Sequence, residues 1–126
     1  MGESDRRLIL IIDDEEDIRT MLENFFESLE YRTVSAADLN QTVFILNRET
    51  PDIVFLDIVL PGVNGIEILK LLKKLIPELI VVMMSGFATE PKAKAALQLG
   101  AFDYLNKPFD MSHIKGMLDR IETLLI

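Results

Sequence analysis

The sequence contains no cysteine, and His113 is the only histidine among its 126 residues. The absence of cysteine excludes a disulfide framework and a thiolate metal site. Long apolar runs are also missing: the first run, residues 8–12, is too short for a secretory signal, and nothing approaches the ~20 residues of a membrane helix. We therefore expect a cytoplasmic protein without a membrane segment, in which His113 is a surface residue.

Positive charge is scarce as well. The chain has 13 lysine and arginine residues against 21 acidic residues, which gives a net charge of −8 at neutral pH. This balance argues against direct binding of nucleic acid, which requires a basic face to neutralise phosphates. The 49% apolar and 27% charged residues are typical of a globular chain, and the length fits one domain. We expect an N-terminal tail over residues 1–7 and one domain over residues 8–126.

Five short runs of strand-forming residues alternate with helical patterns along the chain. Residues 8–12, 53–56 and 79–84 are apolar without alternation, which is typical of parallel strands covered on both faces. Residues 31–34 and 102–105 are more polar and suit edge strands. Helical spacing of apolar residues or helix-end signals follow each run, over residues 18–29, 39–46, 66–74, 89–100 and 114–125. We predict an α/β fold with five helices on a doubly wound, five-stranded parallel sheet of order 2-1-3-4-5, as in flavodoxin-like folds.

Charged and hydroxyl side chains follow the ends of these predicted strands. Asp13 and Asp14 follow the first strand, Asp57 the third, Ser85 the fourth and Lys107 the fifth. Because ligands bind at the carboxyl ends of parallel strands, we expect these side chains to meet at one edge of the sheet. Three carboxylates about 5 Å apart would repel by roughly 3 kcal/mol per pair at an effective dielectric constant near 20. Lys107 balances only one of these charges.

The surplus negative charge indicates a divalent cation. Mg²⁺ suits a site of few carboxylates completed by water and phosphoryl oxygens. The loop after the first strand is acidic and lacks glycine, so it favours a cation over the phosphate of a nucleotide or flavin. Asp57 is the candidate nucleophile, because a carboxylate can form an aspartyl phosphate whose oxygens Lys107 and Ser85 would contact. The backbone carbonyl of Val59, in a turn-rich segment, is the candidate third protein ligand of the metal.

Four motifs at successive strand ends together resemble the receiver domain of two-component response regulators. They are Ile12-Asp13-Asp14-Glu15, Leu56-Asp57-Ile58-Val59-Leu60-Pro61-Gly62, Met84-Ser85-Gly86 and Lys107-Pro108-Phe109, and the resemblance covers residues 8–126. It implies a phosphorylation-dependent signalling switch. Asp57 would accept a phosphoryl group from the phosphohistidine of a sensor histidine kinase or phosphotransfer protein, in a Mg²⁺-dependent reaction without turnover of a separate substrate.

The resemblance also implies roles for individual residues. Asp13 and Asp14 match the metal-binding pair, and Ser85 and Lys107 match the conserved hydroxyl and the lysine, which is usually joined to its proline by a cis peptide bond. Tyr104 matches the aromatic residue that reports phosphorylation to the face formed by the fourth helix, fifth strand and fifth helix. An output domain or downstream protein would read this face. A homodimer through it is left open.

Other functions of the chain, and purely structural roles for the candidate site residues, remain open at this point. A magnesium-dependent aspartyl-phosphate phosphatase would need an acid two residues after the nucleophile, where this chain has Val59. An inactive receiver-like module would bind partners without reacting. The acidic pair alone would also suit a helix start, Ser85 a turn, and Tyr104 an edge strand. Because neither Val59 nor Phe87 can orient an attacking water, we expect slow loss of the phosphoryl group.

Overall fold

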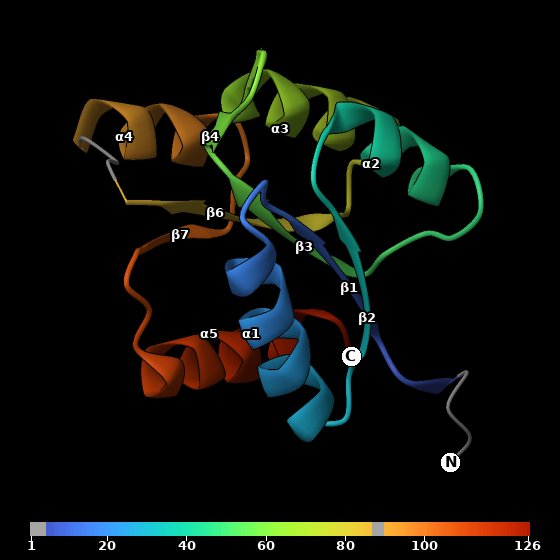
Figure 1. Cartoon of the computed structure of the whole chain (residues 1–126). Helices are drawn as coiled ribbons and strands as arrows, with labels where there is room; N and C mark the ends of the chain where they lie inside the picture. Colours follow the sequence, from blue (N-terminus) through green and yellow to red (C-terminus); the bar gives the residue numbers. More distant parts are fainter. Residues whose placement is uncertain (1–4, 87–89) are drawn as a thin grey trace.

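The computed structural model describes residues 5–86 and 90–126, in which five parallel strands form the central sheet (Figure 1). The strands are β1 (Leu8–Ile12), β2 (Arg32–Ala36), β3 (Ile53–Asp57), β6 (Ile80–Ser85) and β7 (Asp103–Asn106). They lie in the order β2-β1-β3-β6-β7, and each adjacent pair is parallel. Numbered within this sheet alone, the order is 2-1-3-4-5, so the predicted doubly wound α/β topology is confirmed.

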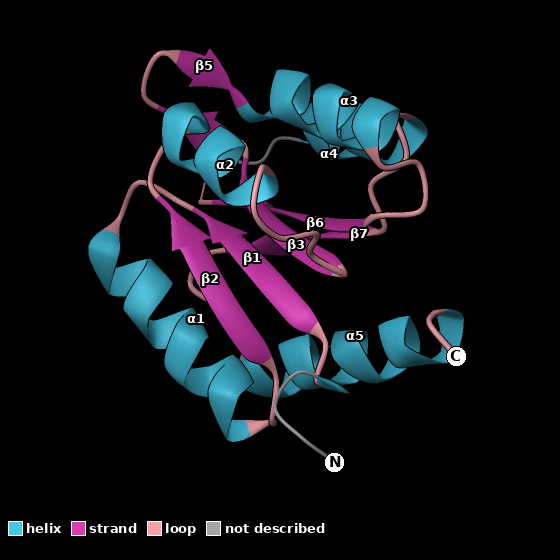
Figure 2. Cartoon of the chain, turned by 90° about the vertical axis from the view of Figure 1, so that its right-hand side faces the viewer, coloured by secondary structure: helices cyan, strands magenta, loops and turns pink. Residues whose placement is uncertain are grey.

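The helices of the described residues cover both faces of the sheet. α1 (Glu16–Ser28) and α5 (Met111–Leu124) lie on one face. On the other lie α2 (Leu39–Leu46), α3 (Gly65–Leu75) and α4 (Glu90–Gln98), as Figures 1 and 2 show. The five predicted helices are therefore present. Over the part of the chain that the structure describes, no helix is both long and apolar enough to cross a membrane.

The strand β1 shows why the inner strands are apolar without alternation. Ile9 and Ile11 belong to the core that α1 and α5 cover, together with Phe55 of the next strand. Leu10 and Ile12 belong to the separate core beneath α2, α3 and α4. Successive side chains of a strand point to opposite faces, so a strand covered on both sides needs apolar residues at every position. By contrast, most of β2 is only half-buried, as expected of an edge strand.

A small antiparallel hairpin follows β3, where the sequence predicted only a turn-rich loop. In it, β4 (Val59–Leu60) pairs with β5 (Val63–Asn64). Pro61 and Gly62 lie at the turn, and Gly62 has a φ of 74°, which residues with a side chain rarely adopt. Strands of two residues leave no periodic pattern to detect. The hairpin places the backbone of Val59 directly beyond the end of the central strand.

Glu15 differs from the other residues that directly precede a helix. Asp38, Asn64 and Asp110 precede α2, α3 and α5, and each side chain accepts hydrogen bonds from backbone N–H groups of the first turn. Glu15 precedes α1 but makes no capping hydrogen bond. Its carboxylate is turned toward Lys107 instead.

Arg7, the last residue of the predicted tail 1–7, is joined to the end of α5. Its Nε donates to Glu122 Oε1 at 2.6 Å, and its guanidinium also donates to the carbonyl of Leu125 at 3.1 Å. The hydroxyl of Tyr31 donates to the second carboxylate oxygen of Glu122 at 2.6 Å. The network ties the start of β1 to the end of α5, while the division into a tail and a domain stays a prediction.

Candidate functional site

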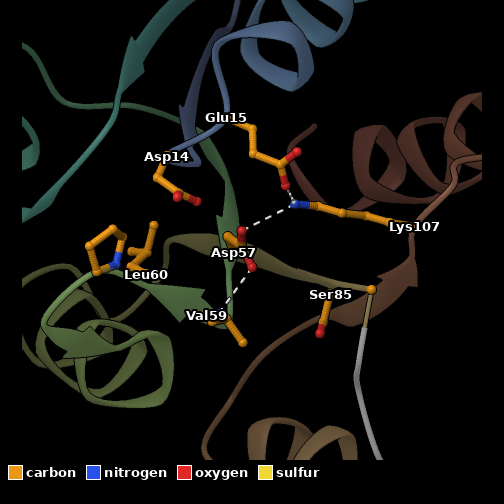
Figure 3. Close-up of a pocket in the computed structure, with 9 residues that line it drawn as sticks. Asp14, Glu15, Asp57, Val59, Leu60, Ser85 and Lys107 are labelled. Carbon is orange, nitrogen blue, oxygen red and sulfur yellow. Dashed lines mark hydrogen bonds and ion pairs between the residues drawn. The ribbon is translucent and has the colours of Figure 1, made fainter.

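The carboxyl ends of the central strands meet around one cleft. Asp57 is the last residue of β3 and Ser85 the last of β6, while Lys107 directly follows β7. All three line a common space of about 360 Å³, in which Figure 3 shows Lys107 and Asp57 directed toward each other. Its lining residues are Asp14, Glu15, Asp57, Val59, Leu60, Pro61, Ser85, Gly86 and Lys107. The strand ends therefore converge as predicted.

Four carboxylates gather at this edge. Asp13, Asp14, Glu15 and Asp57 each offer an oxygen, and these oxygens all lie within 4.8 Å of one another. The sequence predicted three of the four. Glu15 was not singled out, although its place directly after two predicted metal ligands was a signal for it. Four carboxylates against one lysine leave a larger negative surplus than we expected.

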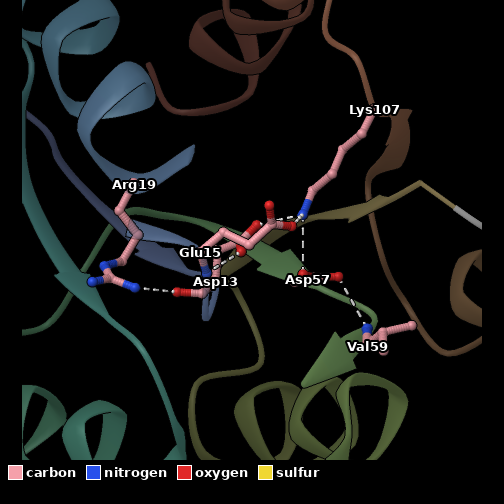
Figure 4. Close-up of polar contacts among 6 residues, drawn as sticks. All are labelled: Asp13, Glu15, Arg19, Asp57, Val59 and Lys107. Atoms are coloured by element: carbon pink, nitrogen blue, oxygen red, sulfur yellow. Dashed lines mark hydrogen bonds and ion pairs between the residues drawn. The ribbon is translucent and has the colours of Figure 1, made fainter. Parts of the chain in front are cut away.

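Lys107 is the positive charge within this cluster. Its Nζ lies 2.7 Å from Asp13 Oδ2, 3.1 Å from Asp57 Oδ2 and 3.3 Å from Glu15 Oε1 (Figure 4). Burial alone would lower the pKa of Lys107, but the hydrogen bonding and negative charge of Asp13 and Asp57 outweigh it and raise the pKa above its ordinary value. The ammonium group is therefore held in its charged form.

Both carboxylate oxygens of Asp57 have a partner. The backbone N–H of Val59 donates to Oδ1 at 3.0 Å, and Lys107 donates to Oδ2 at 3.1 Å. Burial is the main cause that raises the pKa of Asp57, and the negative charge of Asp13 adds to it. The contacts to Val59 and Lys107 oppose this rise without cancelling it. Two donors thus hold the carboxylate in position, while burial and the charge of Asp13 disfavour its ionised form.

Asp13 is fully buried beneath the cleft. Its Oδ1 accepts a hydrogen bond from the backbone N–H of Glu15 at 2.9 Å, and its backbone carbonyl accepts one from Arg19 Nη1 at 2.9 Å. Its Oδ2 is close to Lys107 but has no well-directed hydrogen-bond donor among the described residues. A buried carboxylate oxygen with spare acceptor capacity, beside other acidic side chains, suits a divalent cation. The donor set therefore fits a metal such as Mg²⁺.

Gly65 lets the first turn of α3 approach the end of β3. Its backbone N–H donates to the carbonyl of Ile58 at 2.8 Å. A Cβ atom at this position would lie 2.7 Å from the Cα of Ile58 and would also overlap the carbonyl oxygen of Asp57. Only glycine allows this contact without a shift of the backbone. Gly65 thus supports the strand end that carries Asp57.

The remaining predicted residues lie at different distances from the cleft. Ser85 is buried and lines it, and the bond from Lys107 to Pro108 is cis, as the resemblance implied. Tyr104 is not among the lining residues. It lies on β7, opposite Met83 of β6, and packs against the core on the side of α2, α3 and α4. Phe87 lies outside the described residues.

Comparison with known proteins gives a consistent match. The response regulator receiver domain family matches residues 9–119. Sporulation initiation phosphotransferase F of Bacillus subtilis is 37% identical over 112 residues, which are 89% of this chain and 90% of that protein. The nitrogen assimilation regulatory protein NtrX of Azorhizobium caulinodans is 36% identical over 92% of this chain, which spans only 26% of that relative.

Solved structures agree with these sequence matches. The receiver domain of NtrX from Brucella abortus superposes with a TM-score of 0.84 at 36% identity, covering 90% of this chain and 96% of that one. A two-component response regulator from Clostridium difficile reaches a TM-score of 0.89 at 24% identity, covering 94% and 97% of the two chains. The second likeness concerns the fold alone.

Proposed function

Because the chain belongs to the response regulator receiver domain family, we propose that Asp57 is the residue on which this signalling switch accepts a phosphoryl group. The observation that carries the proposal is the position of Asp57. It ends a buried central strand inside the acidic cleft, with Lys107 Nζ at 3.1 Å from one carboxylate oxygen. The chemistry of phosphoryl transfer needs a nucleophile held next to positive charge.

In the proposed reaction, a carboxylate oxygen of Asp57 attacks the phosphorus of a phosphohistidine on a sensor histidine kinase or phosphotransfer protein. The new O–P bond forms as the P–N bond breaks, and the electron pair of the P–N bond stays on the histidine nitrogen, which takes up a proton from solvent. Lys107 pairs with the oxygens of the transferred group, and the Ser85 hydroxyl donates to another of them. These two side chains would hold the product in one orientation.

Asp13, Asp14, Asp57 and the backbone carbonyl of Val59 would hold a Mg²⁺ ion in this cleft. The gathering of the acidic side chains and the buried Oδ2 of Asp13 support this assignment. When bound, the ion would neutralise negative charge on the transferring phosphoryl oxygens. The carboxylates themselves keep the ion beside Asp57, and Lys107 balances the charge that remains.

Ser85 and Tyr104 would pass the change at Asp57 to the face of α4, β7 and α5. The pairing of β6 with β7 supports this route. Tyr104 of β7 lies opposite Met83 of β6, and Asn106, two positions after Tyr104, lies opposite Ser85. Phosphorylation would then shift the population of two arrangements of that face. An output domain or a downstream protein would read it, and a homodimer through the same face is one further arrangement.

The proposal is tested by incubation with acetyl phosphate and Mg²⁺, followed by intact-mass measurement. We expect a mass gain of one phosphoryl group, with acetate as the leaving group, and no gain when EDTA removes the metal. Asp57→Asn should abolish the gain. Asp52→Asn is the matched control, because Asp52 lies at the opposite end of β3 and accepts a hydrogen bond from the backbone of Leu8. A gain that persists in Asp57→Asn would refute the assignment.

A further inference from the structure

Three carboxylates share the ammonium group of Lys107 in this arrangement. It carries three N–H bonds, and three carboxylates lie within ion-pair distance, those of Asp13, Glu15 and Asp57. A phosphoryl group on Asp57 adds oxygens that need the same donors. The phosphoryl oxygens would therefore compete with these carboxylates for the same ammonium group.

The contact of Glu15 is the one best placed to give way. The side chain of Asp13 is fully buried, and that of Asp57 is only 6% exposed, whereas that of Glu15 is 60% exposed. Its distance of 3.3 Å to Nζ is also the longest of the three. Water can solvate Glu15 after it leaves, but the other two carboxylates have no such replacement.

The start of α1 does not hold the side chain of Glu15. Glu15 is the residue before α1, where the shorter side chains of Ser, Thr, Asp and Asn usually cap the helix, and its own side chain makes no capping hydrogen bond. Figures 3 and 4 show the side chain extending across the mouth of the cleft to Lys107. Asp13 Oδ1 accepts a hydrogen bond from the backbone N–H of Glu15 and so fixes the backbone position from which the Glu15 side chain extends.

We propose that Glu15 is a positioning residue that competes with the incoming phosphoryl group for Lys107. This inference rests on the proposed function of Asp57 and goes beyond it. Before phosphorylation, Glu15 holds part of the positive charge of Lys107 and adds a negative charge at the mouth of the cleft. Both effects oppose a dianionic group on Asp57, and both end when the side chain swings into solvent. Glu15 thereby lowers the affinity of the site for a phosphoryl group.

A role of Glu15 as a further metal ligand predicts the opposite result. Its oxygen lies within 4.8 Å of the other acidic oxygens, so its removal would then weaken the metal and, with it, the bound phosphoryl group. The direct contact with Lys107 favours competition over metal binding. The two roles are separated when phosphoryl affinity is measured at saturating Mg²⁺ and the affinity for Mg²⁺ alone is measured beside it.

The experiment compares the full chain with Glu15→Gln and with the control Glu16→Gln, which removes the neighbouring acidic charge from the exposed first turn of α1. Beryllium fluoride serves as the phosphoryl mimic, and its affinity is measured by titration calorimetry at saturating Mg²⁺. We expect Glu15→Gln to bind it about threefold to tenfold more tightly than the unchanged chain, as an ion pair and a like-charge repulsion are removed. Glu16→Gln should stay within about twofold.

A merely structural role of Glu15 would leave the affinity unchanged or reduce it, so tighter binding is specific to competition. Glu15→Ala provides a second variant and should move in the same direction. Equal or weaker binding in both variants overturns the inference, as does an increase of the same size in Glu16→Gln. If the unchanged chain still gains a phosphoryl group on Asp57 in that case, the proposed function stands and only the role of Glu15 is wrong.

Discussion

Lys107 Nζ lies 3.1 Å from Asp57 Oδ2, although the two residues are 50 positions apart in the sequence. The contact exists because β3 and β7 flank β6 in one parallel sheet, so that their carboxyl ends face the same cleft. Among the described residues, the ion pairs of the acidic side chains in that cleft are all made with this lysine. Its charge therefore bears on stability as well as on phosphoryl chemistry.

Lys107→Met should destabilise the metal-free protein. The substitution leaves Asp13 and Asp57 buried without their cation, and breaking a largely buried charge pair in this way costs about 1–3 kcal/mol. Urea denaturation at neutral pH in EDTA measures the free energy of unfolding. Lys70→Met is the matched control, because Lys70 forms an exposed ion pair with Glu67 and should change stability by less than about 0.5 kcal/mol. Equal stability of the two variants would contradict this prediction.

Asp57→Asn should stabilise the metal-free protein at neutral pH. The pKa of Asp57 is raised in the folded state, mainly by burial and also by Asp13, so the folded state holds the proton more tightly than the unfolded chain. The contribution of a protonated Asp57 is then fully present below the unfolded pKa near ~3.9 and is lost as the pH rises through the folded pKa. Asparagine does not titrate and avoids this loss.

Denaturation curves of the two proteins in EDTA, collected from acid to neutral pH, measure this effect. The stability advantage of Asp57→Asn should grow as the pH rises and disappear toward low pH. Mg²⁺ at neutral pH should stabilise the unchanged chain more than the variant, because Asp57 is a proposed ligand. An advantage that stays constant with pH would show that the charge of Asp57 is not its cause.

The sequence was sufficient to predict the sheet because its strands are marked by composition. Residues 8–12 are apolar at every position and rich in branched residues, as expected of a strand buried on both faces, and β1 has those bounds. The order of strands then followed from which runs are polar. The hairpin of β4 and β5 could not be predicted in this way, since its pairing depends on the turn at Gly62 and not on periodic side chains.

The site was predictable where residue type and strand end coincide. Asp57 and Lys107 each follow a strand, so topology alone brings them to one edge. Glu15 and Arg19 were missed because their roles depend on side-chain direction. Glu15 extends across the cleft, and Arg19, from the first turns of α1, reaches back to the carbonyl of Asp13. A charged residue beside a helix start usually faces solvent. Only the place of Glu15 directly after Asp13 and Asp14 pointed to a role, and nothing in the sequence marked Arg19.

Gly65→Ala and Gly116→Ala should change stability in opposite directions. A Cβ at position 65 would overlap the backbone of Asp57 and Ile58, which must shift, and we expect a loss of about 1–3 kcal/mol. Gly116 lies within α5, where a Cβ atom would meet only open space, so alanine there should add about 0.5–1 kcal/mol through helix propensity. Thermal or urea unfolding of both variants provides the measurement. A stabilised Gly65→Ala would refute the close approach of α3 to the strand end.

Tyr31→Phe should remove a pH-dependent part of the stability at the opposite end of the sheet. Burial raises the pKa of Tyr31, and its hydrogen bond to Glu122 raises it further, so the folded state favours the neutral phenol. The sign follows from linkage: stability from this group is complete below the unfolded pKa near ~10 and falls as the pH rises above it. Urea denaturation between neutral pH and about pH 10.5 should therefore show a steeper loss of stability for the unchanged chain than for Tyr31→Phe.

At neutral pH the Tyr31→Phe variant should be less stable by about 0.5–2 kcal/mol, because Glu122 loses one donor but keeps Arg7. Parallel curves for the two proteins above pH ~9 would mean that the phenol does not titrate differently in the folded and unfolded states, which would contradict the prediction.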